Sequence, residues 1–121
     1  MELIESVGLG SYTHRTAAEL SYGRKRALEI ATTLALDPEV LLLDEPTSGM
    51  GHEDVGSITD LIQDLAANRT VVLVEHNLSV VCAVSDFITV LARGEVLAEG
   101  DYAHVSKCKE VVSAYMGNAH A

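Results

Sequence analysis

The residues best suited to chemistry follow two apolar runs of the sequence. Asp44 and Glu45 come directly after Val40–Leu43, and His76 comes shortly after Thr70–Val74. Open α/β sheets bind ligands at the carboxyl ends of their strands, so two neighbouring strands would bring these side chains to one edge. There an aspartate suits a hydrated Mg²⁺ ion, a glutamate can orient or deprotonate an attacking water, and an imidazole can contact a terminal phosphate. Taken singly, the acidic pair is also compatible with a solvated strand end, and the histidine with a structural role.

A second candidate site, for an anion, lies at the start of a predicted helix. Ser21 is a plausible N-cap, and a helix N-terminus offers a phosphate free N–H groups and a partial positive charge. Gly23 would let a phosphate approach the backbone closely, and Arg24 with its two basic neighbours adds positive charge. The same residues also fit an ordinary serine-capped helix with a basic, solvated first turn.

The helix that carries this second site is predicted over residues 21–36. It ends at Asp37, because a residue that precedes proline is disfavoured in the α region. Its apolar stripe, at helical spacing, consists of Leu28, Ala31, Leu34 and Ala35.

The acidic pair and the histidine depend on two predicted strands. The run Val40–Leu43 is continuously apolar, which predicts a strand that is buried on both faces. A helix is predicted over residues 53–67, and Thr70–Val74 is a second strand rich in β-branched residues. Strand, helix and strand in this order predict a βαβ unit with a parallel pair and a right-handed crossover.

The last third of the chain predicts a hairpin between helices. A short helix is expected over about residues 77–84. The strands Phe87–Ala92 and Glu95–Ala98 then flank a turn at Arg93-Gly94. A final single helix is expected over residues 103–115.

Composition excludes several classes of protein. The 121 residues include 18 acidic and 8 basic side chains, a net charge of −10, which argues against a nucleic-acid-binding surface. The two cysteines are too few for a disulfide framework and lack metal-ligand spacing. No apolar run approaches the roughly 18 residues of a membrane span, and the acidic start does not resemble a signal peptide. We therefore expect a soluble intracellular protein that reaches a membrane only through a partner.

Together these segments resemble the ATP-binding subunits of ABC transporters. Leu20–Arg24 is similar to the signature loop of that family. Leu41–Pro46 resembles the Walker B motif with its catalytic glutamate, and residues 47–51 resemble the D-loop. Val72–His76 resembles the segment that ends in the switch histidine. The order and spacing of all four motifs agree with the family.

The chain also departs from the family pattern. Tyr22 stands where the commonest signature has glycine, Arg24 where it has glutamine, and Gly51 where the D-loop usually has aspartate. No G-x-x-x-x-G-K-[ST] sequence occurs, so the P-loop that holds the β- and γ-phosphates is absent from these residues, as is the Q-loop. We therefore expect the chain alone to hydrolyse ATP negligibly, which leaves open whether it is an enzyme by itself.

The resemblance implies roles for individual residues. In this family two subunits dimerise head to tail, and each ATP lies between the P-loop of one subunit and the signature of the other. Ser21 and Gly23 would then bind the γ-phosphate of the partner's ATP, within a cofactor-binding segment that includes Tyr22 and Arg24. In the chain's own site, Asp44 would act on Mg²⁺ through water, Glu45 would be the general base or water-positioning residue, and His76 would clamp the γ-phosphate.

The resemblance also implies a fold and partners. The fold would be a partial, P-loop NTPase-like α/β domain with a parallel βαβ core, a signature helix and a carboxyl-terminal hairpin plus helix. Residues 1–37 would form the helical signature region, and residues 38–121 the core part with Walker B, D-loop and switch histidine. The partners would be a second ABC ATPase subunit and transmembrane permease subunits, with no nucleic acid. The chain would be cytoplasmic, held peripherally at the inner face of the plasma membrane by the permease.

Finer features concern the transported substrate. Tyr22 in the signature, the continuation Leu28–Ala31 and the run Val74–Val81 resemble subunits for branched-chain amino acids. The carboxyl-terminal half of such an ATP-binding subunit is thus the leading hypothesis. The alternative is a catalytically silent module that docks on an ABC ATPase partner.

Overall fold

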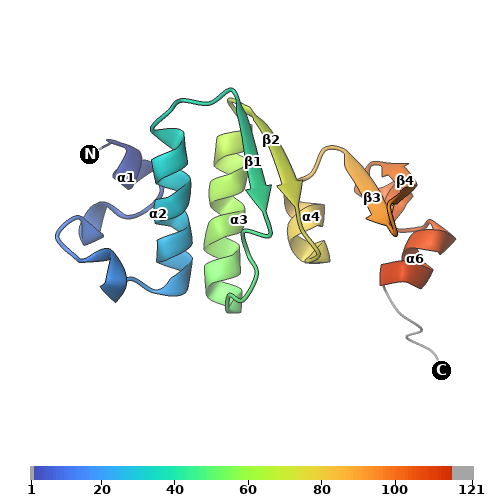
Figure 1. Ribbon diagram of the computed structural model, residues 1–121, viewed down its shortest axis with the longest axis horizontal. Coiled ribbons are helices and arrows are strands. Elements are labelled where there is room, and N and C mark those ends of the chain that lie inside the picture. The colour runs from blue at the N-terminus through green and yellow to red at the C-terminus, as the bar shows by residue number, and fades with distance from the viewer. Residues whose placement is uncertain (1, 116–121) are drawn as a thin grey trace. The chain divides into compact units, whose positions relative to one another are not determined.

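The computed structural model describes residues 2–115 of the chain (Figure 1). Its contacts group the chain into two compact units, residues 1–80 and 81–121, and the division falls inside helix α4 (Leu78–Val84). The first unit contains three further α-helices, two short 3-10 helices and two strands. They are α1 (Glu2–Ser6), η1 (Gly10–Tyr12), η2 (Ala17–Glu19), α2 (Tyr22–Leu34), β1 (Val40–Asp44), α3 (His52–Ala66) and β2 (Thr70–Val74).

The two strands of the first unit form the predicted parallel pair. Val40 lies opposite Thr70 and Asp44 lies opposite Val74, with α3 as the connection between the strands. Because the register is in step over all five positions, both strands end at the same level of the sheet. The residues that follow β1 and β2 therefore start from one edge, as the βαβ prediction requires.

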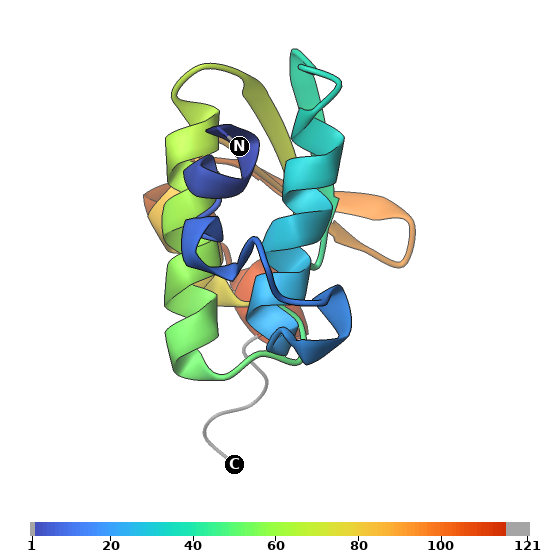
Figure 2. The same ribbon diagram turned by 90° about the vertical axis from the view of Figure 1, so that its left-hand side faces the viewer.

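Helices α2 and α3 lie side by side in both views of the ribbon (Figures 1 and 2). The apolar stripe predicted for α2 is partly wrong, since Leu28 is only half-buried and Ala35 is exposed. The buried stripe is instead rotated towards α1 and α3, the two helices that contact α2. It consists of Gly23, Ala27, Ile30, Ala31 and Leu34, and it meets Ile58, Leu61 and Ile62 of α3 in one core.

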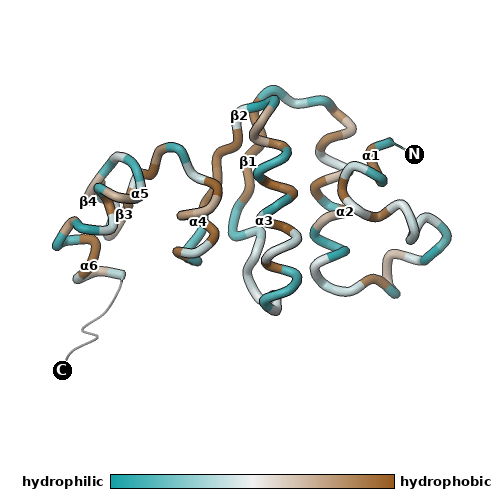
Figure 3. The backbone as a smooth tube through the Cα atoms, turned by 180° about the vertical axis from the view of Figure 1, so that it is seen from behind, coloured by the Kyte–Doolittle hydropathy of each residue, from teal (hydrophilic) through white to brown (hydrophobic). Residues whose placement is uncertain are grey.

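The prediction that β1 is buried on both faces is wrong for this chain. Leu41 is 1% exposed, whereas its neighbour Leu42 is 72% exposed. Val40, Val72 and Val74 alternate in the same way and are also exposed, so one face of the pair is apolar and open. The physical reason is that the core of this unit, to which α2, α3 and Leu41 contribute, lies against one face of the two strands. Hydrophobic colouring runs along most of β2 in the tube view (Figure 3).

The second unit is built on the predicted hairpin. Strand β3 (Ile88–Ala92) pairs with β4 (Glu95–Gly100) in antiparallel fashion, with an irregularity between Val90 and Leu91. Both turn residues have positive φ, 54° at Arg93 and 81° at Gly94, as a two-residue hairpin of this hand requires.

The single final helix predicted over residues 103–115 is wrong, because two short helices occupy that stretch. They are α5 (Tyr102–Val105), capped by Asp101, and α6 (Lys109–Tyr115). Val105 and Val111 are both buried, yet residues six positions apart would lie on different faces of one continuous helix. The break between α5 and α6 allows both to be buried. None of the helices within residues 2–115 is long and apolar enough to span a membrane.

Candidate functional site

Glu45 and His76 meet at the shared edge of β1 and β2. The Nδ1 atom of His76 lies 3.3 Å from Oε1 of Glu45, and both side chains are largely exposed. A backbone bond supports this arrangement, because the Glu45 N–H donates to the Val74 carbonyl at 2.8 Å. The expectation that the two strand ends bring these side chains together is therefore confirmed, while their catalytic roles stay a prediction.

The backbone at Glu45 adopts an unusual conformation. Its φ is 44°, in the left-handed region that non-glycine residues rarely occupy. Such a residue costs about 1–3 kcal/mol and persists where neighbouring structure over-determines it. Here a turn follows at once, closed by the Ser48 N–H donating to the Glu45 carbonyl at 3.1 Å, with Pro46 and Thr47 buried inside it. Asp37 and Arg93 also have positive φ, so this conformation by itself does not mark Glu45 as functional.

Asp44, the predicted magnesium residue, ends β1 as an exposed carboxylate. Within residues 2–115, no hydrogen bond or ion pair engages its carboxylate, and no group of three or more acidic, histidine or cysteine side chains is arranged to hold a metal. Magnesium commonly uses one or two carboxylates and takes its other ligands from water and phosphate. Asp44 therefore fits a single ligand of a nucleotide-bound Mg²⁺, and the described residues do not form a metal cage.

Sequence reasoning missed Glu75, the best-connected acidic side chain of the site. Its Oε1 accepts from the Thr47 hydroxyl and from the Thr47 N–H at 3.0 Å, while Oε2 accepts from the N–H groups of His76 at 3.1 Å and Asn77 at 3.2 Å. Partial burial alone would raise the pKa of Glu75, but these four donors outweigh it and hold the pKa below its usual value. The only sequence signal was an acidic residue between the strand and the histidine.

The predicted phosphate-binding segment lies at the N-terminus of α2. The hydroxyl of Ser21 accepts from the Arg24 N–H at 3.4 Å, so the predicted N-cap is confirmed. The N-termini of α2 and α3 and the carboxyl ends of both strands all face the lower end of the unit in Figure 1. Tyr22 is 52% exposed, and a Cβ placed on Gly49 would lie 3.9 Å from its ring. The signature segment thus adjoins the D-loop-like turn of the same chain.

Gly23 is buried where α2 meets α3. A Cβ at this position would lie 2.6 Å from Cγ and 2.8 Å from Cβ of Asp54, which is closer than side chains tolerate. Close packing of the two helices therefore requires glycine here. The further role of Gly23 in admitting a phosphate stays a prediction.

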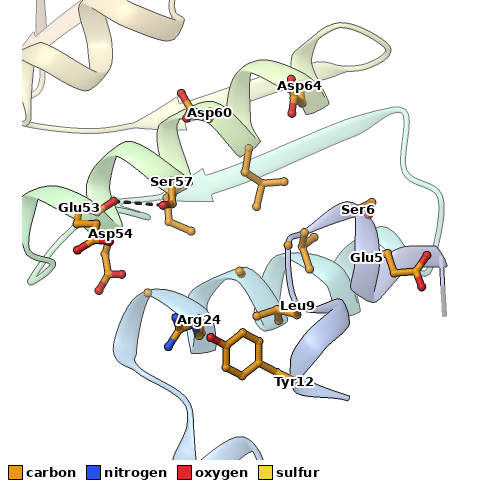
Figure 4. Close-up of a pocket in the computed structure, with 16 residues that line it drawn as sticks. Glu5, Ser6, Leu9, Tyr12, Arg24, Glu53, Asp54, Ser57, Asp60 and Asp64 are labelled. Atoms are coloured by element: carbon orange, nitrogen blue, oxygen red, sulfur yellow. Dashed lines mark hydrogen bonds between the residues drawn. The ribbon is translucent and has the colours of Figure 1, made fainter. Parts of the chain in front are cut away.

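Arg24 lies in a cavity of about 540 Å³ between α1, α2 and α3 (Figure 4). Its guanidinium carbon stands 4.3 Å from the centre of the Tyr12 ring, a cation–π contact. The other charged groups of the cavity are all acidic, namely Glu5, Glu53, Asp54, Asp60 and Asp64. This negative lining disfavours an anion, and neither Glu45 nor His76 belongs to it. This cavity is therefore separate from the Glu45–His76 edge.

Comparisons with known proteins show which family this chain resembles. Residues 1–48 match the family model described as ABC transporter. The chain is 36% identical over 118 residues to LivG of Escherichia coli K12 and to BraF of Pseudomonas aeruginosa, both described as high-affinity branched-chain amino acid transport ATP-binding proteins. Each alignment covers 96% of this chain and 46% of the relative, so the chain spans about half the length of these proteins.

A solved structure shares the fold. The ADP conformation of MJ1267, described as an ATP-binding cassette of an ABC transporter, superposes with a TM-score of 0.86 at 29% sequence identity. The match covers 96% of this chain and 48% of MJ1267. The resemblance to ABC transporter ATP-binding subunits, and the P-loop NTPase-like fold that it implied, are therefore confirmed over the part that the chain spans.

Proposed function

We propose that this chain is the carboxyl-terminal half of an ABC transporter ATP-binding subunit and provides the water-activating half of an ATP hydrolysis site. The observation that carries the proposal is the 3.3 Å approach of His76 to Glu45 at the common end of two parallel strands. Two motif segments that lie far apart in the sequence thus place a carboxylate and an imidazole on one spot. That pair suits an attacking water beside a terminal phosphate.

The residues of this edge would divide the chemistry between them. Glu45 would orient the water and accept its proton, and it stands at the surface where a ligand can reach it. In the imidazolium form both nitrogens of His76 donate, so Nδ1 can serve Glu45 while Nε2 serves a phosphate oxygen. Asp44 would hold Mg²⁺ through water, and the ion would supply charge neutralisation for the transferred phosphoryl group.

The phosphate cradle must come from residues that this sequence does not contain. A polypeptide with the P-loop could cover the open face of β1 and β2, which exposes Val40, Leu42, Val72 and Val74. In the assembled transporter, the start of α2 with Ser21 and Tyr22 would face the ATP of a second ATPase subunit, whereas Gly23 packs against Asp54 and Arg24 lines the acidic cavity. Permease subunits would then hold the assembly at the inner face of the plasma membrane.

Phosphate-release assays test this proposal. The purified chain with ATP and Mg²⁺ should show no turnover above background. Addition of a polypeptide that carries the P-loop and Q-loop half of a LivG-type subunit should restore turnover, and Glu45→Gln should abolish it, since removal of one catalytic group commonly costs about 10²–10⁴-fold. Glu39→Gln, at an exposed glutamate beside β1, is the matched control. Magnesium-dependent turnover by the chain alone, sensitive to Glu45→Gln, would contradict the expected inactivity.

The same assay separates the alternative function. A catalytically silent docking module would bind the P-loop polypeptide without contributing Glu45 to catalysis. In that case the restored turnover, or the turnover of an intact ABC ATPase partner, would be the same with the original chain and with Glu45→Gln. The exposed apolar sheet face favours docking in either case, so only the Glu45 variant distinguishes the two.

We also propose branched-chain amino acids as the transported substrates. The support is the 36% identity to LivG and BraF, whose descriptions name that transport. Uptake of labelled leucine is the test, in cells that lack their own LivG-type subunit and receive this chain together with the P-loop polypeptide. Uptake of leucine but not of histidine is expected, and the absence of any uptake despite restored ATP hydrolysis would reject this substrate class.

A further inference from the structure

Glu75 contacts two segments that carry the candidate catalytic pair. Thr47, which donates twice to Oε1, lies two residues after Glu45 in the tight turn that follows β1. His76 and Asn77, which donate to Oε2, form the turn that follows β2. The two oxygens of one carboxylate therefore hold two turns, one on each side of the Glu45–His76 contact.

The chemistry of this arrangement requires an ionised carboxylate. All four partners are donors, three backbone N–H groups and one hydroxyl, so the side chain must offer acceptors at both oxygens. A glutamine has the same shape but would turn an NH₂ group towards one of the two turns. The amide oxygen could accept hydrogen bonds from one turn, but the NH₂ group would face the donors of the other turn. Thr47 is 5% exposed, so its donors have little access to water as a substitute partner.

We propose that Glu75 is a positioning residue that clamps the turn after β1 to the turn after β2 and thereby sets the approach of Glu45 to His76. The clamp acts through Thr47 on one side and through the His76 and Asn77 backbone on the other. Its consequence for hydrolysis rests on the proposed function, whereas the clamp itself is a property of this chain without nucleotide.

The sheet does not need the clamp. Five paired positions join β1 to β2, and the Glu45 N–H to Val74 carbonyl bond continues this pairing by one residue. A variant at Glu75 should therefore keep the parallel pair and change only the two turns. This expectation separates a positioning role from a general loss of folding.

Amide hydrogen exchange and NMR on the full 121-residue chain test the clamp. In Glu75→Gln, protection at one of the two turns, Thr47 or His76 with Asn77, should fall about tenfold, as loss of a bond to a charged acceptor predicts. Protection of the amides within β1 and β2 should stay the same. Glu75→Asp keeps the charge but is one methylene shorter, so it should retain the hydrogen bond to the nearby Asn77 N–H and lose the hydrogen bonds to Thr47. The control is Glu39→Gln, and unchanged protection in both Glu75 variants would overturn the clamp.

A second measurement reports on the positioning itself. The ring ¹⁵N shifts of His76 should change when Glu45 becomes glutamine in the original chain, because Nδ1 lies against that carboxylate. In a Glu75→Gln background the response to Glu45→Gln should be at least halved. An equal response in both backgrounds would show that Glu75 does not position the pair. Neither readout needs ATP, so an intact clamp with no ATP hydrolysis in the complementation assay would reject only the proposed function.

The original chain provides a test if Glu75→Gln fails to fold. As pH falls, the amide proton signals of Thr47, His76 and Asn77 should move with one shared midpoint, since they serve one carboxylate. The Glu45 carboxylate and the His76 ring lie at the same edge, so the titration is repeated in Glu45→Gln and the Thr47 signal is given most weight. Separate midpoints for Thr47 and Asn77 would overturn the proposal.

Discussion

Three carboxylates lie near the ends of β1 and β2, and their surroundings suit them to different roles. Asp44 and Glu45 are exposed and can meet a ligand. Glu75 is partly buried, and both of its oxygens accept hydrogen bonds, from Thr47, His76 and Asn77. Residue type alone does not separate these roles, because all three are acidic residues at the carboxyl end of an apolar strand.

The depressed pKa of Glu75 predicts a pH dependence of stability. Its carboxylate contributes stability in full above the usual glutamate pKa of about 4.3, and this contribution is lost as the pH falls through the lower pKa of the folded state. Urea unfolding should therefore show Glu75→Gln to be less stable than the original chain at pH 7. The difference between the two should shrink below about pH 4. A difference that is constant with pH would contradict the charge-based account.

Gly23 and Gly56 form a matched pair for a second prediction. Gly23→Ala should destabilise the chain by about 1–3 kcal/mol, because the added Cβ collides with Asp54. Gly56→Ala, in the middle of α3 with open space at its Cβ position, should stabilise it by about 0.5–1 kcal/mol. Denaturant unfolding measures both. Equal effects of the two substitutions would mean that α2 and α3 do not approach closely at Gly23.

At the scale of the element, strand β1 has one buried face and one exposed face. Leu41 is buried in the core, while Leu42 points to the open side of the pair. Both residues sit in one uninterrupted apolar run, which predicts burial on both faces. The apolar character of the open side favours the hypothesis that another polypeptide layer covers it.

The two leucines give an element-scale prediction. Leu41→Ala should cost about 2–5 kcal/mol of unfolding free energy, as a cavity in a packed core does. Leu42→Ala should cost less than about 1 kcal/mol in the chain by itself, since its side chain is 72% exposed. Urea denaturation monitored by circular dichroism measures both values. A loss at Leu42 as large as at Leu41 would show that the open face is covered, for example by a second copy.

At the scale of the whole molecule, the chain combines a net charge of −10 with an open apolar sheet face. The charge opposes aggregation, while the face offers a binding surface to one specific layer. The two compact units, residues 1–80 and 81–121, differ in content, because every predicted site residue lies in the first. The second unit contributes the hairpin and the two short helices.

A whole-molecule prediction follows from the open face. Leu42→Lys should leave the free energy of unfolding of the chain by itself within about 1 kcal/mol, because the lysine points to water. In the complementation assay the same variant should lower restored turnover at least about tenfold at limiting P-loop polypeptide, since a charge would then be buried without a partner. Leu42→Ile is the control. Undiminished turnover with Leu42→Lys would place the docking surface elsewhere.

Much of the local structure was predictable, because local signals depend on neighbours in the chain. Helical and strand periodicity located α2, α3, α4, β1, β2 and the hairpin, and Ser21 and Arg93-Gly94 marked boundaries correctly. The predicted end of α2 at Asp37 is late, because the helix ends at Leu34. The order of strand, helix and strand implied that Glu45 and His76 would share an edge, and the contact between them agrees. Strand order and motif spacing therefore predicted the contact between Glu45 and His76, but not the hydrogen bonds of Glu75.

Only the tertiary structure decided what depends on residues distant in sequence. It rotated the buried stripe of α2 towards Ala27 and Ile30, left Leu42 exposed, and broke the last helix so that Val105 and Val111 could both be buried. It also made Glu75 the acceptor for donors 28 positions away at Thr47. Burial and hydrogen bonding of this kind are set by which surfaces meet in space, and no periodicity along a single segment encodes which partner it will meet.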